Sequence, residues 1–479
     1  MQKHIYFSIL LLFSVFYTST AQKVVSSNPI PFNISKDDFV IIGLWHNNPL
    51  VFIQQEKQYE LYSFSKQLST IEKIPFPNQD GHIVQLDFIV LDNIIYAFYE
   101  VEKKKIYTFY TRKYENNIWS TPNTIIQKDA SEINKPIFNI VHSKNKMHHL
   151  LTLLYKENHK QNIDVVVFDN RFSASLSLHH EMSKENAFLN KEMAVSNIGI
   201  PYLLVTDVPS YKDNLVEEIF WLSPNESKSE MILFPISLSN HTIHDFHISI
   251  DEIQQILYLT SWYGDGKFHD SKGIFISTCD LQLTQTPSKH FMQIRKNNFG
   301  EKADMDDLNI RNISIKNNAS IEIIAERVYQ NNRTISGYNP NLDINMMSMN
   351  QNVRNVSEYY FDDIFIFNIK PDFTISWTQN VMKEQLSIDD YGLYSSFCIL
   401  ENEKGKIFFF NDVNKHNERT FVSYVNSLGD YSMSEVPKTE ALTRLNILTK
   451  AAKQLDKASL LFPAFNVNML QFILVDYHN

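Results

Sequence analysis

The chain contains 479 residues, of which 43% are hydrophobic, 13% aromatic and 20% charged. This composition provides enough apolar surface for a large core and excludes general disorder. The formal net charge is −10 and the basic residues form only short clusters, which argues against a nucleic acid or an anionic bilayer as the partner.

The N-terminus has the composition of a signal peptide. An apolar run extends from Ile5 to Tyr17, and the small residues Ser19, Thr20 and Ala21 follow it. We predict cleavage before Gln22 and export to the periplasm, to the outer membrane or out of the cell. No later segment reaches the roughly 20 apolar residues that a transmembrane helix needs.

A repeated unit follows along the chain. Each copy contains a short strand rich in Ile, Val, Phe and Tyr, a polar turn and a second alternating strand. Most copies are preceded by two further apolar strands, so the repeat is about four strands long, and its spacing is about 50 residues in the first five copies. The seven copies begin at Glu60, Lys105, Asp164, Glu218, Gly273, Asp363 and Thr420.

Units of this length, repeated in series, are typical of a β-propeller, in which each blade buries its faces against its neighbours. We therefore predict an all-β fold, with a single propeller domain over residues 22–479. The seven copies favour seven four-stranded blades, with six or eight as alternatives. The terminal strands, including the final FILVDYHN, are expected to close the ring.

The segment SWYGDGKFHD, Ser261–Asp270, combines aromatic and polar residues between two strands. An aromatic pair beside polar groups could stack on a sugar ring or a peptide side chain. A long turn whose rings cover a blade edge is the preferred structural alternative. The candidate binding residues are Trp262, Tyr263, Asp265, Lys267 and His269.

A second candidate loop extends from Gly337 to Ser357, where an insertion interrupts the sixth repeat. Its Asn, Ser and Pro content offers little to bury, while Met346, Met347 and Met349 supply adaptable apolar side chains. Long loops on a rigid scaffold often bind partners. The sequence is equally consistent with a loop that binds a partner and with a loop that has no role.

The adjacent carboxylates Asp362 and Asp363 suggest an acid pair. However, Asp363 occupies the position at which every other copy opens its third strand. Adjacent strand residues point to opposite faces, so the two carboxylates could share a substrate only at a bulge. We interpret them as structural.

The segment Glu440–Ala458 is rich in Ala, Leu, Lys and Gln, and its propensity predicts a helix. Its position after the seventh copy predicts a strand, because a further hairpin is needed there. The sequence leaves this segment ambiguous.

Motifs for metals and cofactors are incomplete. The segment Asn411–Asn417 lacks the Gly and Glu of a calcium loop, and the pairs His148–His149 and His179–His180 have no third zinc ligand at a useful spacing. There is no nucleophile elbow or phosphate loop. We predict no metal and no cofactor. We expect Cys279 and Cys398 to be unpaired core residues.

One region carries a family resemblance. Between Leu308 and Val436 the order IRNISIKNNASIEIIAERVY, YYFDDIFIFNIKPDFTISW, VMKEQLSIDDYGLYSSF and KIFFFNDVNKHN resembles a group of exported propeller-like proteins of Bacteroidetes. The match covers about a quarter of the chain. The resemblance implies the propeller fold and the bacterial cell envelope as the compartment, and it transfers no catalytic residue because this family has no established activity.

The sequence therefore favours a non-enzymatic binding or assembly module of the cell envelope, with a protein or glycan as ligand. The alternative is a propeller glycan hydrolase that uses carboxylates from separate blades, such as Asp265, Asp306 and Asp389. The fold does not decide between them, because one scaffold hosts many functions.

Overall fold

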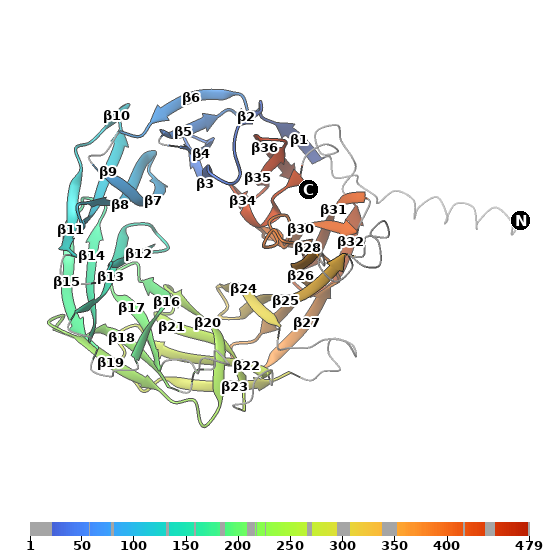
Figure 1. Ribbon diagram of the computed structural model, residues 1–479. Coiled ribbons are helices and arrows are strands. Elements are labelled where there is room, and N and C mark those ends of the chain that lie inside the picture. Colours follow the sequence, from blue (N-terminus) through green and yellow to red (C-terminus); the bar gives the residue numbers. More distant parts are fainter. Residues whose placement is uncertain are drawn as a thin grey trace, which may run out of the picture.

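Eight antiparallel sheets surround a central opening (Figure 1). The computed structural model describes residues 22–477 apart from 57, 78–80, 131–133, 158–159, 183–186, 208–215, 217, 226, 266–270, 295–306, 338–351, 415–416 and 436–445. Each sheet is one blade, and the blades are numbered here in chain order from β3. Among the described residues, no helix is long and apolar enough to cross a membrane.

The first four blades use consecutive strands. Blade 1 contains β3 (Asp38–Trp45), β4 (Asn48–Gln55), β5 (Gln58–Phe64) and β6 (Thr70–Pro75). Blade 2 contains β7 (His82–Leu91), β8 (Ile94–Lys103), β9 (Ile106–Glu115), β10 (Ile118–Trp119) and β11 (Asn123–Asp129). Blade 3 contains β12 (Ile137–His142), β13 (His148–Glu157), β14 (Lys160–Asp169) and β15 (Ala174–Glu181). Blade 4 contains β16 (Ala187–Val195), β17 (Pro201–Asp207), β18 (Ile219–Pro224) and β19 (Met231–Ile236).

The next three blades follow the same order. Blade 5 contains β20 (Thr242–Asp251), β21 (Ile256–Gly264), β22 (Ser271–Asp280) and β23 (Ser288–Gln293). Blade 6 contains β24 (Leu308–Ile315), β25 (Ile321–Gly337), β26 (Asn352–Ile369), β27 (Ile375–Val381) and β28 (Leu386–Ile388). Blade 7 contains β29 (Phe397–Asn402), β30 (Gly405–Asn414), β31 (Asn417–Asn426) and β32 (Tyr431–Glu435).

Blade 8 joins the two ends of the described chain. Its C-terminal part contains β33 (Asn446–Ile447), β34 (Lys453–Gln454), β35 (Ser459–Asn466) and β36 (Met469–Tyr477). The N-terminal strands β1 (Gln22–Ser26) and β2 (Ile30–Pro31) both pair with β36, so β1 becomes the outer strand of the last blade. The predicted ring closure is confirmed.

The core consists of eight apolar clusters, each between two adjacent blades. Strand alternation produces this arrangement, because successive side chains point to opposite faces of a blade. On β21, Leu257, Leu259 and Tyr263 pack toward blade 4, whereas Tyr258 and Trp262 pack toward blade 6. Each blade is therefore buried on both faces by its neighbours.

The predicted propeller is confirmed, with eight blades rather than the favoured seven. The seven repeat copies correspond to the third strands β5, β9, β14, β18, β22, β26 and β31. The repeat pattern in the sequence did not reveal the eighth blade, because the outer strand of this blade comes from the other end of the chain. The repeat therefore never appears there as one continuous segment.

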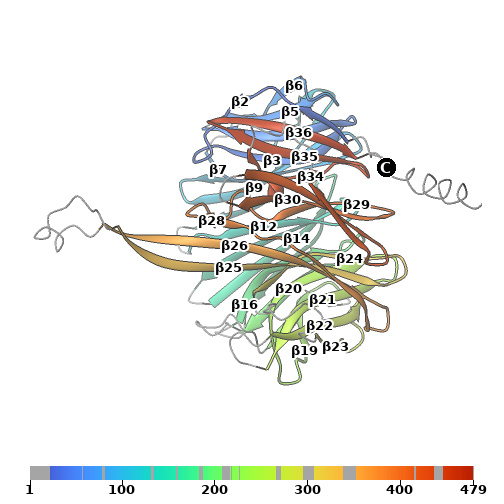
Figure 2. The same cartoon turned by 90° about the vertical axis from the view of Figure 1, so that its right-hand side faces the viewer.

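Blade 6 departs most from the repeat. Its strands β25 and β26 contain 17 and 18 residues, and they form a hairpin that projects beyond the ring (Figure 2). The prediction of a loop over 337–357 therefore extends too far toward the C-terminus, because β26 already begins at Asn352 and its residues 352–357 pair with β25. Met346, Met347 and Met349 lie outside the described residues.

The ambiguous segment 440–458 forms neither a full helix nor a full strand where it is described. It contains β33, one 3₁₀ turn at Thr449–Ala451 and β34. Pairing with β35 overrides the helical propensity of the sequence, because this segment supplies the inner strands of blade 8.

Candidate ligand-binding site in the central channel

The aromatic pair predicted for ligand stacking lies in the core. Trp262 is 0% and Tyr263 is 5% exposed, and both belong to β21 rather than to a loop. Period-two alternation directs one ring into the interface with blade 6 and the other into the interface with blade 4. The expectation that these rings are presented on a loop is wrong.

The polar part of the same segment is only partly described. Asp265 is exposed, and its carboxylate accepts a hydrogen bond from Lys272 Nζ and lies 3.1 Å from Nδ1 of His241. Lys267 and His269 lie outside the described residues. A binding role for Asp265, Lys267 and His269 stays a prediction.

The acidic pair Asp362–Asp363 sits at a register shift. Arg327 of β25 lies opposite both residues, between the pairs Glu326↔Ile364 and Val328↔Phe361. Asp363 accepts hydrogen bonds from the backbone N–H of Lys383 at 3.0 Å and from Asn380 at 3.1 Å. The strand is thus bulged as a shared acid pair would require, but Asp363 serves to anchor the chain that leaves β27.

Beside this bulge lies a buried charge network centred on Glu326. Its carboxylate accepts hydrogen bonds from Lys383 Nζ at 2.8 Å, from Arg311 Nε at 2.9 Å and from Ser396 Oγ at 2.7 Å. The side chains of Glu326 and Lys383 are both 0% exposed. Lys383 also donates to the carbonyl of Phe361 and to Gln385 Oε1, so all three ammonium hydrogens have acceptors.

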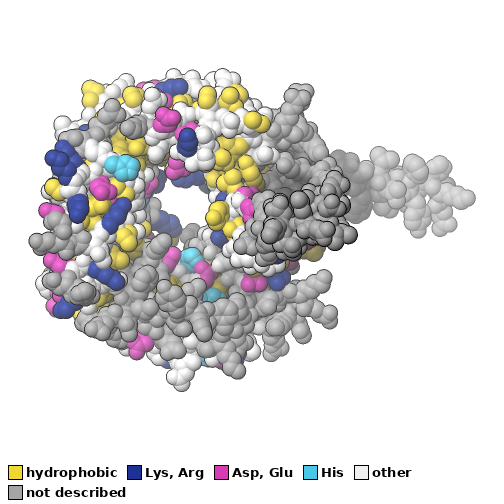
Figure 3. Space-filling view, in the orientation of Figure 1, with side chains coloured by type: hydrophobic (Ala, Val, Ile, Leu, Met, Phe, Trp, Pro, Cys, Tyr) yellow, Lys and Arg dark blue, Asp and Glu magenta, His cyan; other side chains and the backbone are white. Residues whose placement is uncertain are grey.

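A cavity of about 630 Å³ opens next to this network, between the inner strands of blades 6, 7 and 8. Figure 3 shows charged side chains around the central opening that these inner strands border. The cavity is within the size range of small-ligand sites. Its lining contains no Asp or Glu and consists of Asn309, Arg311, Asn312, Val328, Phe361, Ser396, Phe397, Cys398, Ile399, Lys450 and Ala452.

Lys450 reaches the cavity because the 3₁₀ turn is fixed beside it. Thr449 is fully buried, and its hydroxyl donates to the carbonyl of Ser396 at 3.0 Å. Lys450 Nζ donates to the carbonyl of Gly392 at 2.8 Å. Burial lowers the pKa of Lys450, the positive charge of Arg311 lowers it further, and Asp390 and Glu326 oppose these effects.

Gly392 is required for this arrangement. Its φ is +67°, a conformation that L-residues other than glycine rarely adopt, and an added Cβ would lie 2.1 Å from the ring of Phe361. The residue therefore brings its carbonyl to Lys450 and its Cα to the cavity wall at the same time.

A cluster of one histidine and two carboxylates lies on the neighbouring inner strands β16 and β20. His247 Nε2 is 3.3 Å from Asp245 Oδ1, and His247 Nδ1 is 3.8 Å from Glu192 Oε2. Burial alone would lower the pKa of His247, but the hydrogen bond and charge of Asp245, together with Glu192, raise it overall. Asp245 also accepts the N–H of Ile310, which ties blade 5 to β24 next to Arg311.

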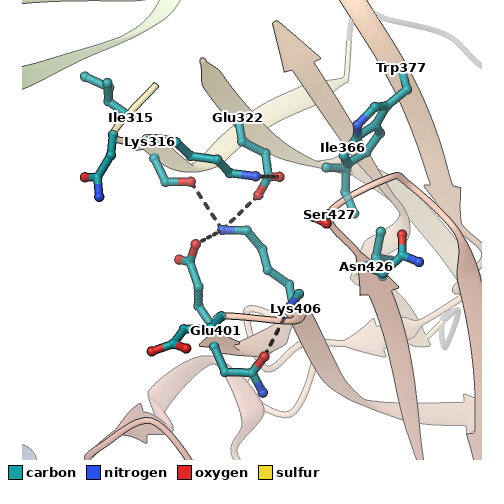
Figure 4. A pocket seen from close by; sticks show the side chains of 15 residues that line it. Ile315, Lys316, Glu322, Ile366, Trp377, Glu401, Lys406, Asn426 and Ser427 are labelled. Carbon is teal, nitrogen blue, oxygen red and sulfur yellow. Dashed lines mark hydrogen bonds and ion pairs between the residues drawn. The ribbon is translucent and has the colours of Figure 1, made fainter. Parts of the chain in front are cut away.

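A second pocket, of about 360 Å³, lies between blades 6 and 7 (Figure 4). Lys406 Nζ is 2.8 Å from Glu322 Oε1, 2.7 Å from Glu401 Oε1 and 3.2 Å from Ser314 Oγ. Trp377 lines another part of the pocket. Because one ammonium bridges both carboxylates, they do not form an open acid–base pair.

The other expected features are placed as follows. Cys279 and Cys398 are both buried and unpaired, as the sequence predicted. Within the described part of the chain, no group of three or more His, Cys, Asp or Glu side chains is arranged to hold a metal ion. Asp389 accepts the N–H of Ser357 at 2.9 Å at the base of the projecting hairpin, and Asp306 lies outside the described residues.

The sequence pattern contains little signal for the channel cavity. Arg311 lies within the segment IRNISI and Lys450 lies in the helix-prone segment, 139 positions later in the chain. The available signal was Arg311 as the single charged residue of β24, because a charged side chain on an inner strand must face the channel or a buried partner.

Several solved structures have a similar overall arrangement at low sequence identity. The WD40 domain of SCAP from fission yeast has a TM-score of 0.42 and 9% identity, over 96% of this chain and 98% of that chain. The polysaccharide lyase Uly1 has a TM-score of 0.37 and 8% identity, over 84% and 92%. Prolyl oligopeptidase B from Galerina marginata has a TM-score of 0.40 and 10% identity, over 90% and 55%. Comparisons with protein-family models and with curated proteins give no match.

Proposed function

We propose that this protein is an exported, non-enzymatic β-propeller that binds a protein or glycan ligand in the bacterial cell envelope. The observation that carries the proposal is the state of the carboxylates at the two cavities. Glu326 is engaged by Lys383 and Arg311, and Glu322 and Glu401 are engaged by Lys406. Carboxylates held in this way bind cations and fix side chains, whereas a glycosidase needs two carboxyl groups that face its substrate.

The hydrolase alternative has little support from its own candidate residues. Asp265 is held by Lys272 and His241, and Asp389 closes the base of the hairpin. Neither residue lines the channel cavity or the pocket between blades 6 and 7. The envelope location rests on the predicted signal peptide over residues 1–21 and on the resemblance to exported propeller-like proteins of Bacteroidetes.

The test combines binding with a search for turnover. The purified mature chain would be applied to arrays of glycans and of envelope-derived peptides, and each ligand retained would then be incubated with the protein and analysed by mass spectrometry. We expect retention without cleavage. Cleavage that is lost in an Asp265→Asn, Asp389→Asn double variant would overturn the proposal in favour of the hydrolase, and failure to retain any ligand would overturn it outright.

The projecting hairpin allows a second test of the proposed binding function. A variant that joins Arg333 to Val356 through Asn-Gly removes residues 334–355. It keeps the ion pair between Arg333 and Glu358, in which Nη2 of the arginine lies 2.6 Å from Oε1 of the glutamate. We expect nearly unchanged thermal stability and weaker retention of the ligand. A large loss of stability would show that the removed segment belongs to the core.

A further inference from the structure

The channel cavity carries positive charge on its lining. Arg311 and Lys450 are its two charged lining residues, and both side chains are at least partly exposed. The nearby carboxylate of Glu326 is already shared between Arg311 and the buried Lys383. Asp390 is likewise occupied, since it accepts the backbone N–H of Gly392. The carboxylates of Glu326 and Asp390 thus bind groups of the protein itself, whereas Arg311 and Lys450 line the cavity.

Both cations retain donors for a ligand. Glu326 is bound by Nε and Nη2 of Arg311, and among the described contacts Nη1 has no acceptor. Lys450 donates to one carbonyl, although an ammonium has three hydrogens. Burial lowers the pKa of Lys450, and repulsion by the positive charge of Arg311 lowers it further, against the attraction of Asp390 and Glu326. An anion between the two side chains would relieve this repulsion and accept the remaining hydrogens.

The rest of the lining suits a ligand that is more than a bare ion. Val328, Phe361 and Phe397 provide an apolar wall, and the side chains of Asn309 and Asn312 provide amide donors and acceptors. Sugars combine apolar ring faces with hydroxyl groups at their edges, and a cavity of about 630 Å³ can hold a short oligosaccharide.

We propose that the cavity between Arg311 and Lys450 binds an acidic oligosaccharide, with a carboxylate or sulfate group of the sugar placed between the two cations. This inference rests on the proposed binding function and names the ligand class for the channel. It predicts binding that weakens with added salt, because a charged contact at a partly open site is screened.

The test is calorimetric titration of the purified mature chain with three oligosaccharides of similar length: an oligogalacturonate, a sulfated dextran fragment and a neutral dextran fragment. We expect the unmodified chain to bind at least one acidic oligosaccharide at low salt and not the neutral one. The carboxylate and sulfate arms distinguish the two sources of negative charge. Equal binding of the neutral sugar would overturn the inference.

Variants locate the site. Lys450→Gln removes a cation at the rim, and we expect at least a threefold loss of affinity; adding Arg311→Gln should raise the loss to tenfold or more. Lys457→Gln is the matched control, because this lysine of blade 8 is 81% exposed and pairs with Glu403 away from the cavity. Its affinity should stay within twofold. Thermal unfolding checks that each variant is folded, and Lys450→Gln alone decides the outcome if the Arg311 variant is unfolded.

The outcomes separate this inference from the proposed function. Affinity that is unchanged in a folded Lys450→Gln variant would place the anion elsewhere and overturn the inference. If neither acidic oligosaccharide binds but the arrays retain another ligand, the inference fails and the binding function stands. If a ligand is cleaved while Lys450→Gln still weakens acidic-sugar binding, the non-enzymatic function fails and the site stands.

Discussion

Lys383 and Glu326 form an ion pair of 2.8 Å in which neither side chain has exposed surface. The pair connects the segment after β27 to strand β25, at the base of the projecting hairpin. Burial lowers the pKa of Lys383, and the charge of Glu326 opposes this effect. Such pairs contribute little net stability when intact, but the loss of Glu326 would leave the buried ammonium of Lys383 without its carboxylate, whereas Glu326 still has Arg311 when Lys383 is lost.

Glu326→Leu should therefore lower the free energy of unfolding by about 3–5 kcal/mol. The double variant Lys383→Met, Glu326→Leu should lose less than the sum of the two single variants, because it removes the stranded charge together with its partner. Urea unfolding measures each value. Lys457→Met at the exposed Lys457–Glu403 pair is the control and should unfold like the unmodified protein. Additive losses would contradict the proposed coupling.

The buried Glu100 should make the stability of the protein depend on pH below neutrality. Its side chain is 3% exposed, and burial raises its pKa to about 7, with Lys135 opposing and Glu102 adding to the shift. The folded state therefore holds the proton more tightly than the unfolded state does. The stability from this group is complete below about pH 4.5 and is lost as the pH rises to about 7.

Glu100→Gln keeps the neutral form at every pH. We expect the variant to match the unmodified protein near pH 4.5 and to exceed its stability by at most about 3 kcal/mol at pH 8. Unfolding in urea at both pH values measures the difference. A difference between the two proteins that does not change with pH would show that Glu100 titrates normally in the folded state.

The buried His149 should give the opposite dependence of stability on pH. It is fully buried, and burial and the neighbouring His142 lower its pKa to about 3, against the hydrogen bond to Asn170. The folded state therefore excludes the proton that the unfolded state takes up. The stability from this group is complete above about pH 6.5 and is lost as the pH falls toward 3.

His149→Gln removes the titrating ring and retains a donor for Asn170, which lies 2.6 Å from His149 Nε2. Between pH 8 and pH 5 the unmodified protein should lose about 2 kcal/mol more stability than the variant. The comparison uses the pH dependence rather than the absolute values, since the substitution also alters packing. Parallel curves for the two proteins would refute the assignment.

Blade 8 predicts the effect of truncation. Removal of the residues after Ser459 deletes most of β35 and all of β36, and it opens the clusters shared with blades 7 and 1. We expect loss of soluble expression, because the opened ring exposes long strand edges. A Val24→Cys, Val475→Cys variant is the complementary probe, since these residues pair across β1 and β36. Oxidised protein should resist urea better than reduced protein, and a stable truncated chain would argue against obligatory closure.

The sequence was informative where local pattern decides structure and uninformative where distant residues meet. Alternation and a repeat of about 50 residues identified the propeller, because each blade uses the same four strands. Trp262 was misplaced because a Gly-containing segment after it resembles a turn, although the alternating pattern of β21 continues through Tyr263. The cavity at Arg311 and Lys450 depends on the packing of three blades, and no local motif encodes that contact.

The pairing of β1 with β36 also sets the order of events during synthesis. Val24 is made early, whereas Val475, opposite it, follows about 450 residues later. At ordinary translation rates this interval is on the order of half a minute or more. Throughout that time β1 has no native partner, and the growing stack of blades presents an unfinished edge at each end. The seam of the ring is thus the last part to form, so a holding factor that shields β1 until the chain is complete would raise the yield of folded protein.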